Sequence, residues 1–503
     1  MQDEHTTLAP LDLTLVIDIG KSNAKLLLMD DGGQVLEQHS RANASVSSAL
    51  GYPALDLQGL AQWMQATLRA SKLALRCGHA ITSTHGAAFV ALGEDGLAWE
   101  PLDYEFEGVA LTGAAATAFH AASGSFAETL SPELPAGLNA ARQLEWLRNS
   151  HPQEWRKTQT LLPYPQYWAW LLSGVACSEV SSLGCHTHLW NPVAATFSSL
   201  AISRGWASLF APLRPAWEVI GTLGPERAAA WGLPAQCQVH AGVHDSNACL
   251  ARYLDSGRAA SAGNARAAGT DSAAGPEALT IVSSGTWTVL MAPGAPAPAL
   301  DAARDMLGNV DVSGRMTPTA RFMGGREFAV LLDGASPQAA SLQALQSLLQ
   351  QRIHAFPSFA PQGGPFASRS GFLERDGVRL PGAIASHLTE AERATLAAAY
   401  CAQLTAWLVG YLWGRTPPAR SRVVVEGPLA GNPVYLQVLQ ALLPASLCQA
   451  SCDSVEGTAR GAWMLSRWTG GLDQGGAGQA GRLQAVDAAP LAGLHAWHAR
   501  WLR

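Results

Sequence analysis

Residues 13–30 read LTLVIDIGKSNAKLLLMD, two apolar runs joined by the polar turn GKSN. Apolar runs on either side of a short Gly-containing turn predict two strands of a β-hairpin. The segment DDGG at 30–33 then turns the chain into a third predicted strand at 34–41. Residues 57–73 carry apolar side chains at helical spacing. The predicted opening topology is therefore strand, turn, strand, turn, strand, helix.

A similar hairpin recurs at 278–292, which read ALTIVSSGTWTVLMA. Before it, residues 238–254 predict a strand (QVHAG), a loop (VHDSN) and a helix (ACLARYL). The recurrence predicts two related lobes with a boundary near residue 248, giving units of 1–248 and 249–503. The Ala/Gly/Ser-rich stretch 255–277 and the Gly-rich stretch 469–482 are expected to be surface insertions.

Composition restricts the class of protein. The 503 residues are 48% hydrophobic and 14% charged, with 33 Lys+Arg against 39 Asp+Glu and a net charge of −6. This chain is long enough for two large domains, and it lacks the basic field that nucleic acid or an anionic membrane attracts. Its eight cysteines include no C-x-x-C pair, and acidic residues stand near the N-terminus where a secretory signal would be basic. We expect a cytoplasmic protein with reduced thiols, and no nucleic-acid or membrane partner.

The segment 396–414 is apolar enough to approach the length of a membrane span. Gln403 and Thr405 interrupt it, and the stretch from Thr389 has the charged, capped beginning of the same helix. We therefore predict a core helix followed by a strand at 422–427.

The first hairpin has residues that suit a nucleoside triphosphate. Backbone N–H groups of such a turn can bind phosphate oxygens, and a carboxylate at the strand end can hold Mg²⁺. The alternative is an ordinary hairpin; a Walker A motif is excluded because Leu15 stands where that motif needs glycine. The candidate residues are Asp18, Gly20, Lys21, Ser22, Asn23 and Lys25.

The second hairpin repeats this pattern with Ser284, Gly285 and Thr286 in its turn region. Two such turns facing each other would hold one nucleotide. Between the hairpins, Asp245 lies in the loop that joins a predicted strand to a helix. A carboxylate there could accept the proton of a substrate hydroxyl that attacks a γ-phosphoryl group. The alternative role of Asp245 is a helix N-cap.

Six stretches in order across almost the whole chain resemble the FGGY family of carbohydrate kinases. They are DIGKSNAKLLLMD, PQYWAWLLSG, GVHDSN, SSGTWTVLM, GGREF and EGPLAGNP. The SSGTW and HD segments look most like rhamnulose kinases, and GKSNAKL with EGPLAGN resembles a fuculose-kinase-like bacterial branch.

The resemblance implies an α/β fold of two RNase H-like lobes, related to actin, hexokinase and Hsp70, that close over ATP and a ketose or polyol. It implies that Asp245 is the general base and that Asp18 and Asp245 lie near Mg²⁺. The turn from Lys21 to Lys25 would be the first phosphate loop, and Thr286 would contact phosphate from the second lobe. The resemblance further implies a sugar site at His85, Gly86, Gln166, His244, Asp245 and Ser246, and a nucleoside pocket bordered by Gly324, Gly325 and Gly427.

Three positions depart from the family pattern. Lys21 replaces a small or hydroxyl residue and could contact phosphate or point to solvent. Gln166 stands where many members have aspartate, which puts the usual sugar hydrogen bonds in doubt. Pro428 replaces a glycine and has no N–H to offer the nucleoside.

Other clusters favour structural roles. Cys177, Cys185, His186 and His188 do not have a usual zinc spacing and are expected to form a local turn or packed thiols. Trp168 and Trp170 could stack on a sugar but are expected to fill the core.

The sequence thus predicts an ATP-dependent kinase in carbohydrate catabolism, acting on a five- or six-carbon ketose such as L-rhamnulose or L-fuculose. One alternative is a catalytically weak sugar-binding or regulatory protein that keeps the kinase fold. Another is an actin- or Hsp70-like ATPase acting on a protein, although that class needs no hydroxyl-binding HD loop. A homodimer is compatible with the sequence, which does not determine the oligomeric state.

Overall fold

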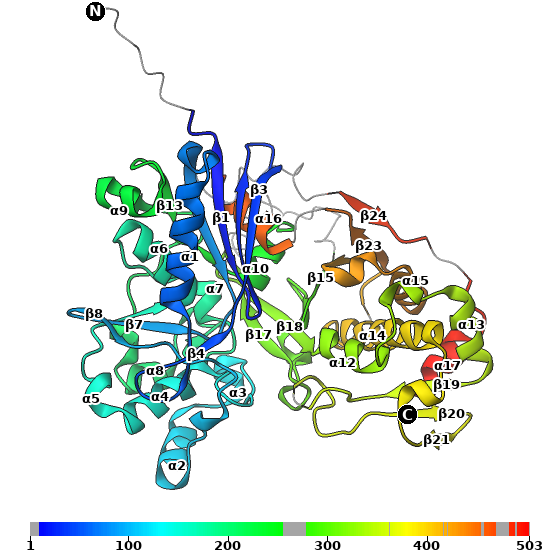
Figure 1. Cartoon of the computed structure of the whole chain (residues 1–503). Coiled ribbons are helices and arrows are strands. Elements are labelled where there is room, and N and C mark those ends of the chain that lie inside the picture. Colours follow the sequence, from blue (N-terminus) through cyan, green and yellow to red (C-terminus); the bar gives the residue numbers. More distant parts are fainter. Residues whose placement is uncertain are drawn as a thin grey trace, which may run out of the picture.

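The chain forms two α/β lobes that lie side by side (Figure 1). The computed structural model describes residues 10–254, 278–361, 363–415, 417–419, 421–453, 457–468, 482–487 and 490–501. One lobe is built on a sheet of strands from 13–244 and the other on a sheet of strands from 279–485. The expected two-lobed α/β fold is confirmed.

The first lobe contains a seven-stranded mixed sheet. In spatial order its strands are β12 (Val219–Thr222), β13 (Gln238–His240), β6 (Cys77–Thr84), β1 (Leu13–Ile19), β2 (Asn23–Met29) and β3 (Val35–Ala42), with β14 (Val243–His244) also paired to β6. β1 runs antiparallel to β2 and parallel to β6. It is buried along its whole length because helices cover both faces of the sheet.

The two faces of β1 pack against different helices. Leu15 and Ile17 point to one face, where they share a core with α1 (Leu57–Ala70), α6 (Tyr164–Ser173) and α9 (Gly224–Trp231). Val16 points to the other face and packs against α10 (Asp245–Ala251) and α16 (Gly457–Leu465). This alternation is the period-two pattern expected of a strand.

Residues 45–55, together with residues between β6 and β12, add a subdomain at the lower end of the first lobe (Figure 1). Its small sheet has the order β8 (Gly96–Trp99), β7 (Phe89–Gly93), β9 (Thr160–Pro163), and a two-stranded sheet pairs β4 (Ser45–Ser47) with β5 (Pro53–Leu55). The surrounding helices are α2 (Gly113–Ala122), α3 (Phe126–Thr129), α4 (Ala140–Ser150), α5 (Pro152–Trp155), α7 (Val180–Leu183) and α8 (Ser199–Ser203), with a short pair β10 (Trp190–Asn191) and β11 (Thr196–Phe197). Buried aromatic residues, Trp99 and Trp206 among them, form the core of this subdomain.

The second lobe contains a second seven-stranded sheet. In spatial order its strands are β17 (Leu307–Val310), β18 (Met316–Phe322), β16 (Thr288–Met291), β15 (Leu279–Ser284), β22 (Arg422–Glu426), β23 (Leu447–Ser451) and β24 (Leu483–Ala485). One face is covered by α12 (Gly324–Leu332), α13 (Leu342–Gln350), α14 (Glu390–Leu412), α15 (Pro433–Leu442) and α17 (Leu494–Trp501). A separate three-stranded sheet consists of β19 (Ile353–Phe356), β20 (Phe372–Arg375) and β21 (Val378–Leu380).

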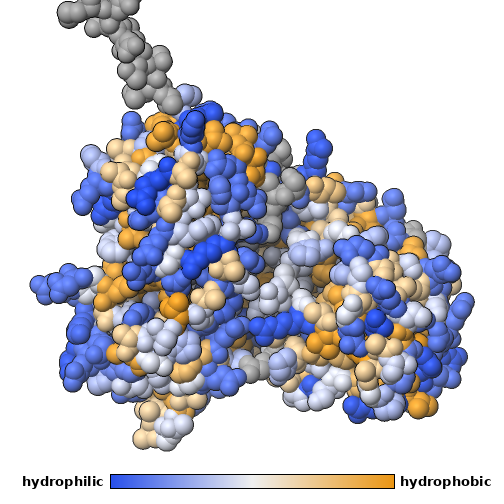
Figure 2. Space-filling model, in the orientation of Figure 1, coloured by the Kyte–Doolittle hydropathy of each residue, from blue (hydrophilic) through white to orange (hydrophobic). Residues whose placement is uncertain are grey.

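Helix α14 is a core helix, as the sequence predicts. Thr389 and Glu392 form a capping box at its N-terminus. Although α14 is long and apolar enough to cross a membrane, 83% of its most apolar window is buried inside the second lobe. On the face shown in Figure 2, hydrophobic residues are dispersed among hydrophilic ones over both lobes.

Helix α10 lies between the two sheets and joins the lobes. Its Ala248 packs with the first-lobe core around Ile81, whereas its Cys249 packs with Ile281 of the second lobe. The neighbouring α16 approaches so closely that a Cβ on Gly461 would lie 1.7 Å from the Ala248 carbonyl oxygen. A domain boundary at residue 248 falls inside α10, and the division into 1–248 and 249–503 stays a proposal.

Both predicted hairpins are confirmed as β1–β2 and β15–β16. The predicted helix at 57–73 ends earlier, at Ala70. The predicted loop VHDSN is instead the short strand β14 followed by the first turn of α10. Of the two expected surface insertions, residues 255–277 and 469–481 lie outside the described residues.

Candidate active site

A cavity of about 620 Å³ lies between the lobes, and both contribute to its walls. The first hairpin, the His85 turn and the start of α10 line it from the first lobe; the second hairpin and the end of β22 line it from the second. The structure therefore brings together segments that are more than 400 residues apart. Fifteen predicted site residues line this cavity: Asp18, Gly20, Lys21, Ser22, Asn23, Lys25, His85, Gly86, His244, Asp245, Ser246, Ser284, Gly285, Thr286 and Gly427.

The first hairpin turn is a compact loop. Gly20 N donates to Asn23 O at 2.9 Å, and the Asn43 side-chain amide donates to Gly20 O at 2.8 Å. Asp18, at the end of β1, accepts a hydrogen bond from Thr458 Oγ1 of α16 at 3.1 Å. Asp18 thus lies where the first sheet meets a helix from the C-terminal half of the chain.

Lys21 is held by acidic residues, which neither sequence-based expectation anticipated. Its Nζ pairs with Asp103, lies 3.8 Å from Glu105 Oε2 and sits 5.2 Å from the centre of the Tyr104 ring. Burial alone would raise the pKa of Asp103, but hydrogen bonds from Lys21 and Ser45 outweigh burial and hold that pKa below its usual value. In this structure Lys21 faces residues 103–105 of the first lobe.

The second hairpin is fastened to the segment after β22. Ser284 Oγ donates to Glu426 O at 2.5 Å and accepts from Leu429 N at 3.0 Å. Gly427 has φ +78°, and a Cβ there would lie 2.1 Å from Ser284 O, so only glycine fits this position. The Ser284–Thr286 turn and the Gly427 segment therefore form one wall of the cavity.

Gly324 and Gly325 do not line the cavity. They begin α12 behind the second hairpin, where a Cβ on Gly324 would lie 2.0 Å from Thr288 Oγ1. A Cβ on Gly325 would lie 2.5 Å from Gly285 O, and Gly325 N donates to Thr286 O at 3.2 Å. These glycines allow the helix to support the turn, and the structure does not place them against a nucleoside pocket.

A buried ion network closes the second-lobe end of the cavity. Glu426 Oε1 accepts from Arg252 Nη1 at 2.5 Å and also from the Tyr253 hydroxyl, and Arg252 pairs in addition with Asp453. Burial raises the pKa of Glu426, an effect that the Arg252 charge opposes. Because Arg252 balances the carboxylate, Glu426 can lie at the cavity wall at less cost than an unpaired anion.

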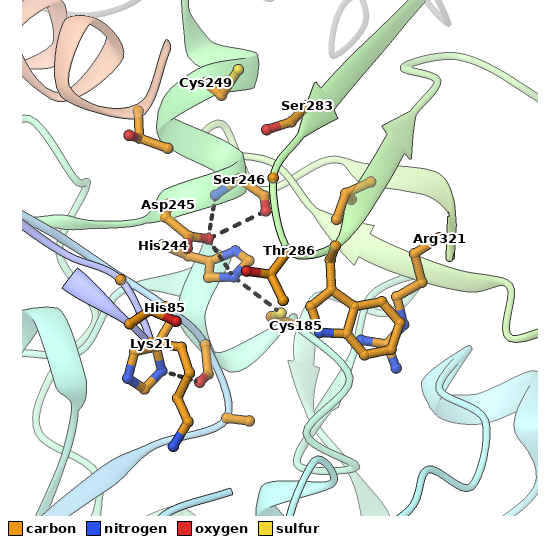
Figure 3. A pocket seen from close by; sticks show the side chains of 18 of the residues that line it. Lys21, His85, Cys185, His244, Asp245, Ser246, Cys249, Ser283, Thr286 and Arg321 are labelled. Atoms are coloured by element: carbon orange, nitrogen blue, oxygen red, sulfur yellow. Dashed lines mark hydrogen bonds and ion pairs between the residues drawn. The ribbon is translucent and has the colours of Figure 1, made fainter. Parts of the chain in front are cut away.

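Asp245 stands at the first turn of α10, directly after its N-cap His244 (Figure 3). Its Oδ1 accepts from Ser246 N at 2.5 Å and Ser246 Oγ at 3.2 Å, and lies 3.2 Å from His244 Nε2. Among the described residues no hydrogen bond or ion pair is made by Oδ2. One carboxylate oxygen is thus fixed by the protein, and the other is left for a ligand.

His244 lines the cavity and is packed against three neighbours, of which Asp245 is one. Its Nε2 also lies 3.4 Å from Cys185 Sγ, and its Nδ1 lies 3.2 Å from Asn247 Nδ2. The hydrogen-bond partner of Nε2 is Cys185 Sγ, and Asp245 Oδ1 approaches the same nitrogen to 3.2 Å. Burial lowers the pKa of His244, opposed by the charge of Asp245, so the ring is neutral near pH 7.

Gly86 is required by close packing. A Cβ there would lie 2.9 Å from His244 Nε2 and 3.0 Å from Cys185 Sγ. The neighbouring His85 is buried, and its Nδ1 contacts Gly86 O at 2.9 Å. Its Nε2 has no hydrogen-bond partner within the part of the chain that the structure describes, so a substrate hydroxyl could supply one.

Gln166 lies outside the cavity. It is fully buried on α6, and its Nε2 donates to Ala241 O at 3.1 Å and Gly242 O at 3.0 Å. These bonds fix the turn that leads into His244 and Asp245. Gln166 therefore supports the loop of the predicted base and does not line the cavity.

The alternative clusters have structural roles. His186 Nδ1 and His188 Nε2 bond the carbonyls of Leu138 and Ser131, and no group of three or more metal-ligating side chains occurs among the described residues. Trp168 is fully buried in the first-lobe core, which confirms the core expectation for that residue. All eight cysteines are free.

Several lining residues were missed by sequence reasoning. Asp103 follows β8 in the subdomain, and Asn309, Arg321 and Trp287 come from the second lobe. Only Trp287 carried a local signal, because it stands inside the quoted SSGTW segment.

The residues of the site fit Mg²⁺ bound jointly by the protein and by the phosphates of a nucleotide. Two carboxylates, Asp18 and Asp245, line one cavity, and Mg²⁺ is commonly held by one or two carboxylates together with phosphate oxygens and waters. A complete protein cage of three or more ligands is not needed for this mode.

Two hairpin turns and a carboxylate around one interlobe cavity define a class of protein: a two-lobed phosphotransferase. Comparisons with known proteins agree. Residues 130–251 match the N-terminal domain of the FGGY family of carbohydrate kinases, and residues 276–474 match the C-terminal domain of carbohydrate kinase FGGY. No match was found among curated protein sequences.

Solved structures match nearly the whole chain. A carbohydrate kinase from Novosphingobium aromaticivorans is 33% identical, with a TM-score of 0.77 and 98% of both chains covered. A xylulose kinase from Rhodospirillum rubrum (16% identical, TM-score 0.70) and a gluconate kinase from Lactobacillus acidophilus (14%, 0.71) each match over 97% of both chains. The chain belongs to the FGGY family of carbohydrate kinases, enzymes that transfer phosphate to an alcohol group. Its fold is that of the actin, hexokinase and Hsp70 superfamily.

Proposed function

We propose that this kinase transfers the γ-phosphoryl group of ATP to a hydroxyl of a five- or six-carbon ketose, with Asp245 as general base. The observation that carries the proposal is the geometry of Asp245, whose Oδ1 is held by Ser246 and His244 while Oδ2 has no partner among the described residues. A carboxylate held in this way can accept a proton without first reorganising.

The proposed step balances as follows. The substrate hydroxyl gives its proton to Asp245 Oδ2 as its oxygen bonds to the γ-phosphorus. The bond from that phosphorus to the oxygen bridging the β- and γ-phosphates breaks, and ADP leaves. His244 Nε2 lies 3.2 Å from Oδ1, so the buried ring would keep the carboxylate in position before the transfer.

The two hairpins are proposed to hold the nucleotide. Backbone N–H groups of the Gly20–Asn23 and Ser284–Thr286 turns would bind phosphate oxygens from opposite lobes. Asp18 and Asp245 would hold Mg²⁺, which when bound neutralises phosphate charge. The catalytically weak alternative is disfavoured because both carboxylates line the cavity.

The size of the cavity and its polar walls support a ketose as the substrate. The first-lobe wall offers His85 Nε2, and the Lys21–Asp103 pair adds charged groups that hydroxyls can bind. The expected substrates include L-rhamnulose and L-fuculose. Solved structures of the same fold include xylulose and gluconate kinases, whose 13–17% identity shows the fold alone. We further propose that the enzyme works in the cytoplasm, in accord with its eight free thiols.

A coupled assay of ADP release tests the proposal. The panel contains L-rhamnulose, L-fuculose, D-xylulose, gluconate and glycerol, each with MgATP. We expect a ketose to give kcat/KM at least tenfold above glycerol, about 1.4 kcal/mol in transition-state binding. If glycerol is the best substrate, the ketose class is wrong; if no acceptor stimulates ADP release, the kinase activity itself is contradicted.

A further inference from the structure

One face of the second sheet forms a wall of the cavity that no sequence motif indicated. Alternate residues of a strand point to the same face, and the lining residues on β17 and β18 follow this spacing: Leu307 and Asn309, then Thr319 and Arg321. On β16, Val289 pairs with Arg321 and lines the cavity too. This wall belongs to the second lobe, whereas the predicted sugar residues all belong to the first.

Among the described residues of β16, β17 and β18 that line the cavity, Arg321 is the one arginine, and it is rigidly held. It is 5% exposed, its Nε donates to Asp305 Oδ1 at 3.1 Å, and its guanidinium carbon lies 4.6 Å from the centre of the Trp287 ring. Asp305 is itself fixed, because its Oδ2 accepts from Gly364 N at 2.8 Å. A planar guanidinium held by an ion pair and an aromatic face is oriented before any ligand arrives.

The ion pair leaves part of this guanidinium unsatisfied. Nη2 lies 3.1 Å from Asp305 Oδ1 but makes no hydrogen bond within the described residues. Arginine has five N–H donors, and of these only the Nε–H has a hydrogen bond to a described residue. Buried donors without acceptors are costly, and the cavity is the space that Arg321 borders.

Arg321 also lies near the predicted sugar site. Burial lowers the pKa of His186, and the positive charge of Arg321 lowers that pKa further. Burial raises the pKa of the Cys185 thiol, and the charge of Arg321 opposes this rise. Cys185 in turn lies 3.4 Å from His244. In Figure 3 the Arg321 side chain descends toward the cavity on the side opposite His85 and Lys21.

We propose that Arg321 is a specificity-determining residue, donating hydrogen bonds to a substrate oxygen remote from the hydroxyl that Asp245 deprotonates. The inference rests on the proposed function. It adds a contact from the second lobe that binds the end of the sugar remote from the hydroxyl that is phosphorylated. Asp305 already balances the charge of Arg321, so the favoured ligand oxygen is a neutral hydroxyl or carbonyl of a ketose. A carboxylate oxygen of an aldonate shares the donor–acceptor chemistry and forms a separate arm of the test.

The test is calorimetric titration without nucleotide, using L-rhamnulose, D-xylulose and gluconate as probes. For the probe that wild type binds best, Arg321→Gln should weaken affinity ten- to a hundredfold, the size expected for a lost charge-assisted hydrogen bond. The matched control is Arg315→Gln on the same hairpin, an arginine paired with Asp311 that does not line the cavity. It should leave affinity unchanged.

A second variant separates recognition from folding. Arg321→Gln leaves Asp305 buried without its cation, so the double variant Asp305→Asn with Arg321→Gln removes that charge as well. If Arg321 binds substrate, the double variant stays as weak as the single one; if affinity recovers, the role was structural and the proposal is overturned. Thermal unfolding of each variant confirms that the lobes are folded.

The outcomes are distinguishable from those of the kinase proposal. ADP release by wild type with any sugar of the panel, combined with Arg321→Gln affinity within twofold of wild type, overturns this inference alone. A loss confined to gluconate supports the contact and assigns it to a carboxylate. If wild type neither binds nor phosphorylates a probe, the substrate class and this inference fail together.

Discussion

Gly86→Ala tests whether the position of His244 controls turnover. An added Cβ would lie 2.9 Å from His244 Nε2, and ordinary contact begins at 3.4 Å, so the ring must move by about 0.5 Å. Nε2 now lies 3.2 Å from Asp245 Oδ1 and 3.4 Å from Cys185 Sγ, so a displaced ring would no longer support the carboxylate in its present position. A shift of about 1 Å in a catalytic group can cost about 100-fold in rate, so a smaller shift should lower kcat about ten- to a hundredfold.

The assay is ADP release under saturating ketose and MgATP, with a thermal unfolding scan of the same sample. Gly221→Ala is the matched control, because a Cβ on that first-sheet glycine meets its neighbours at ordinary distances of 3.4 and 3.5 Å. If Gly86 instead provides room for the sugar, the alanine variant would raise KM and leave kcat unchanged. That result, in a folded variant, would refute the reasoning.

Three further predictions concern the nucleotide, domain closure and pH. Asp18→Ala should lower nucleotide-dependent turnover but leave sugar affinity measured without nucleotide nearly unchanged; a large loss of that affinity would contradict a nucleotide role. The cavity has walls from both lobes, and Arg326 of the second lobe pairs with Glu105 of the first at 3.0 Å. Binding of sugar and a nonhydrolysable ATP analogue should therefore bring the lobes together and reduce the radius of gyration in solution scattering. An unchanged radius at saturation would argue against closure. Burial raises the pKa of Glu179 to about 7, so the native state binds its proton more tightly, and wild type should lose about 3 kcal/mol more unfolding free energy than Glu179→Gln as pH rises from 4.5 to 7. Urea unfolding of wild type and Glu179→Gln at both pH values measures this difference, and identical pH profiles for the two proteins would count against the assignment.

The secondary structure near the site could be predicted because its signals are local. The two hairpins have apolar runs on either side of Gly-containing turns, and Thr389 with Glu392 mark the start of α14 within four residues. Asp18 and Asp245 could be predicted for the same reason: Asp18 lies near the end of β1 and Asp245 directly follows β14, and residues at strand ends gather at the edge of a sheet.

The pairing of side chains across the cavity could not be predicted. Lys21 meets Asp103 only because the subdomain after β6 folds back over the first hairpin. Gln166 carries no sequence signal that separates a ligand contact from its observed bonds to the carbonyls before β14. Arg321 likewise lies on an ordinary-looking strand, and its position becomes informative only when the second lobe faces the first.

Asp245→Asn is the most direct test of the central claim, that this carboxylate removes the proton of the acceptor hydroxyl. Asparagine keeps the size of the side chain, and its amide oxygen can still accept from Ser246 N and Ser246 Oγ, so the fold should be preserved. The measurement is kcat for ADP release with the best ketose, alongside the thermal unfolding midpoint and sugar affinity. The account predicts a fall of about 10²–10⁴-fold in kcat with a near-wild-type midpoint, whereas turnover within threefold of wild type would contradict it.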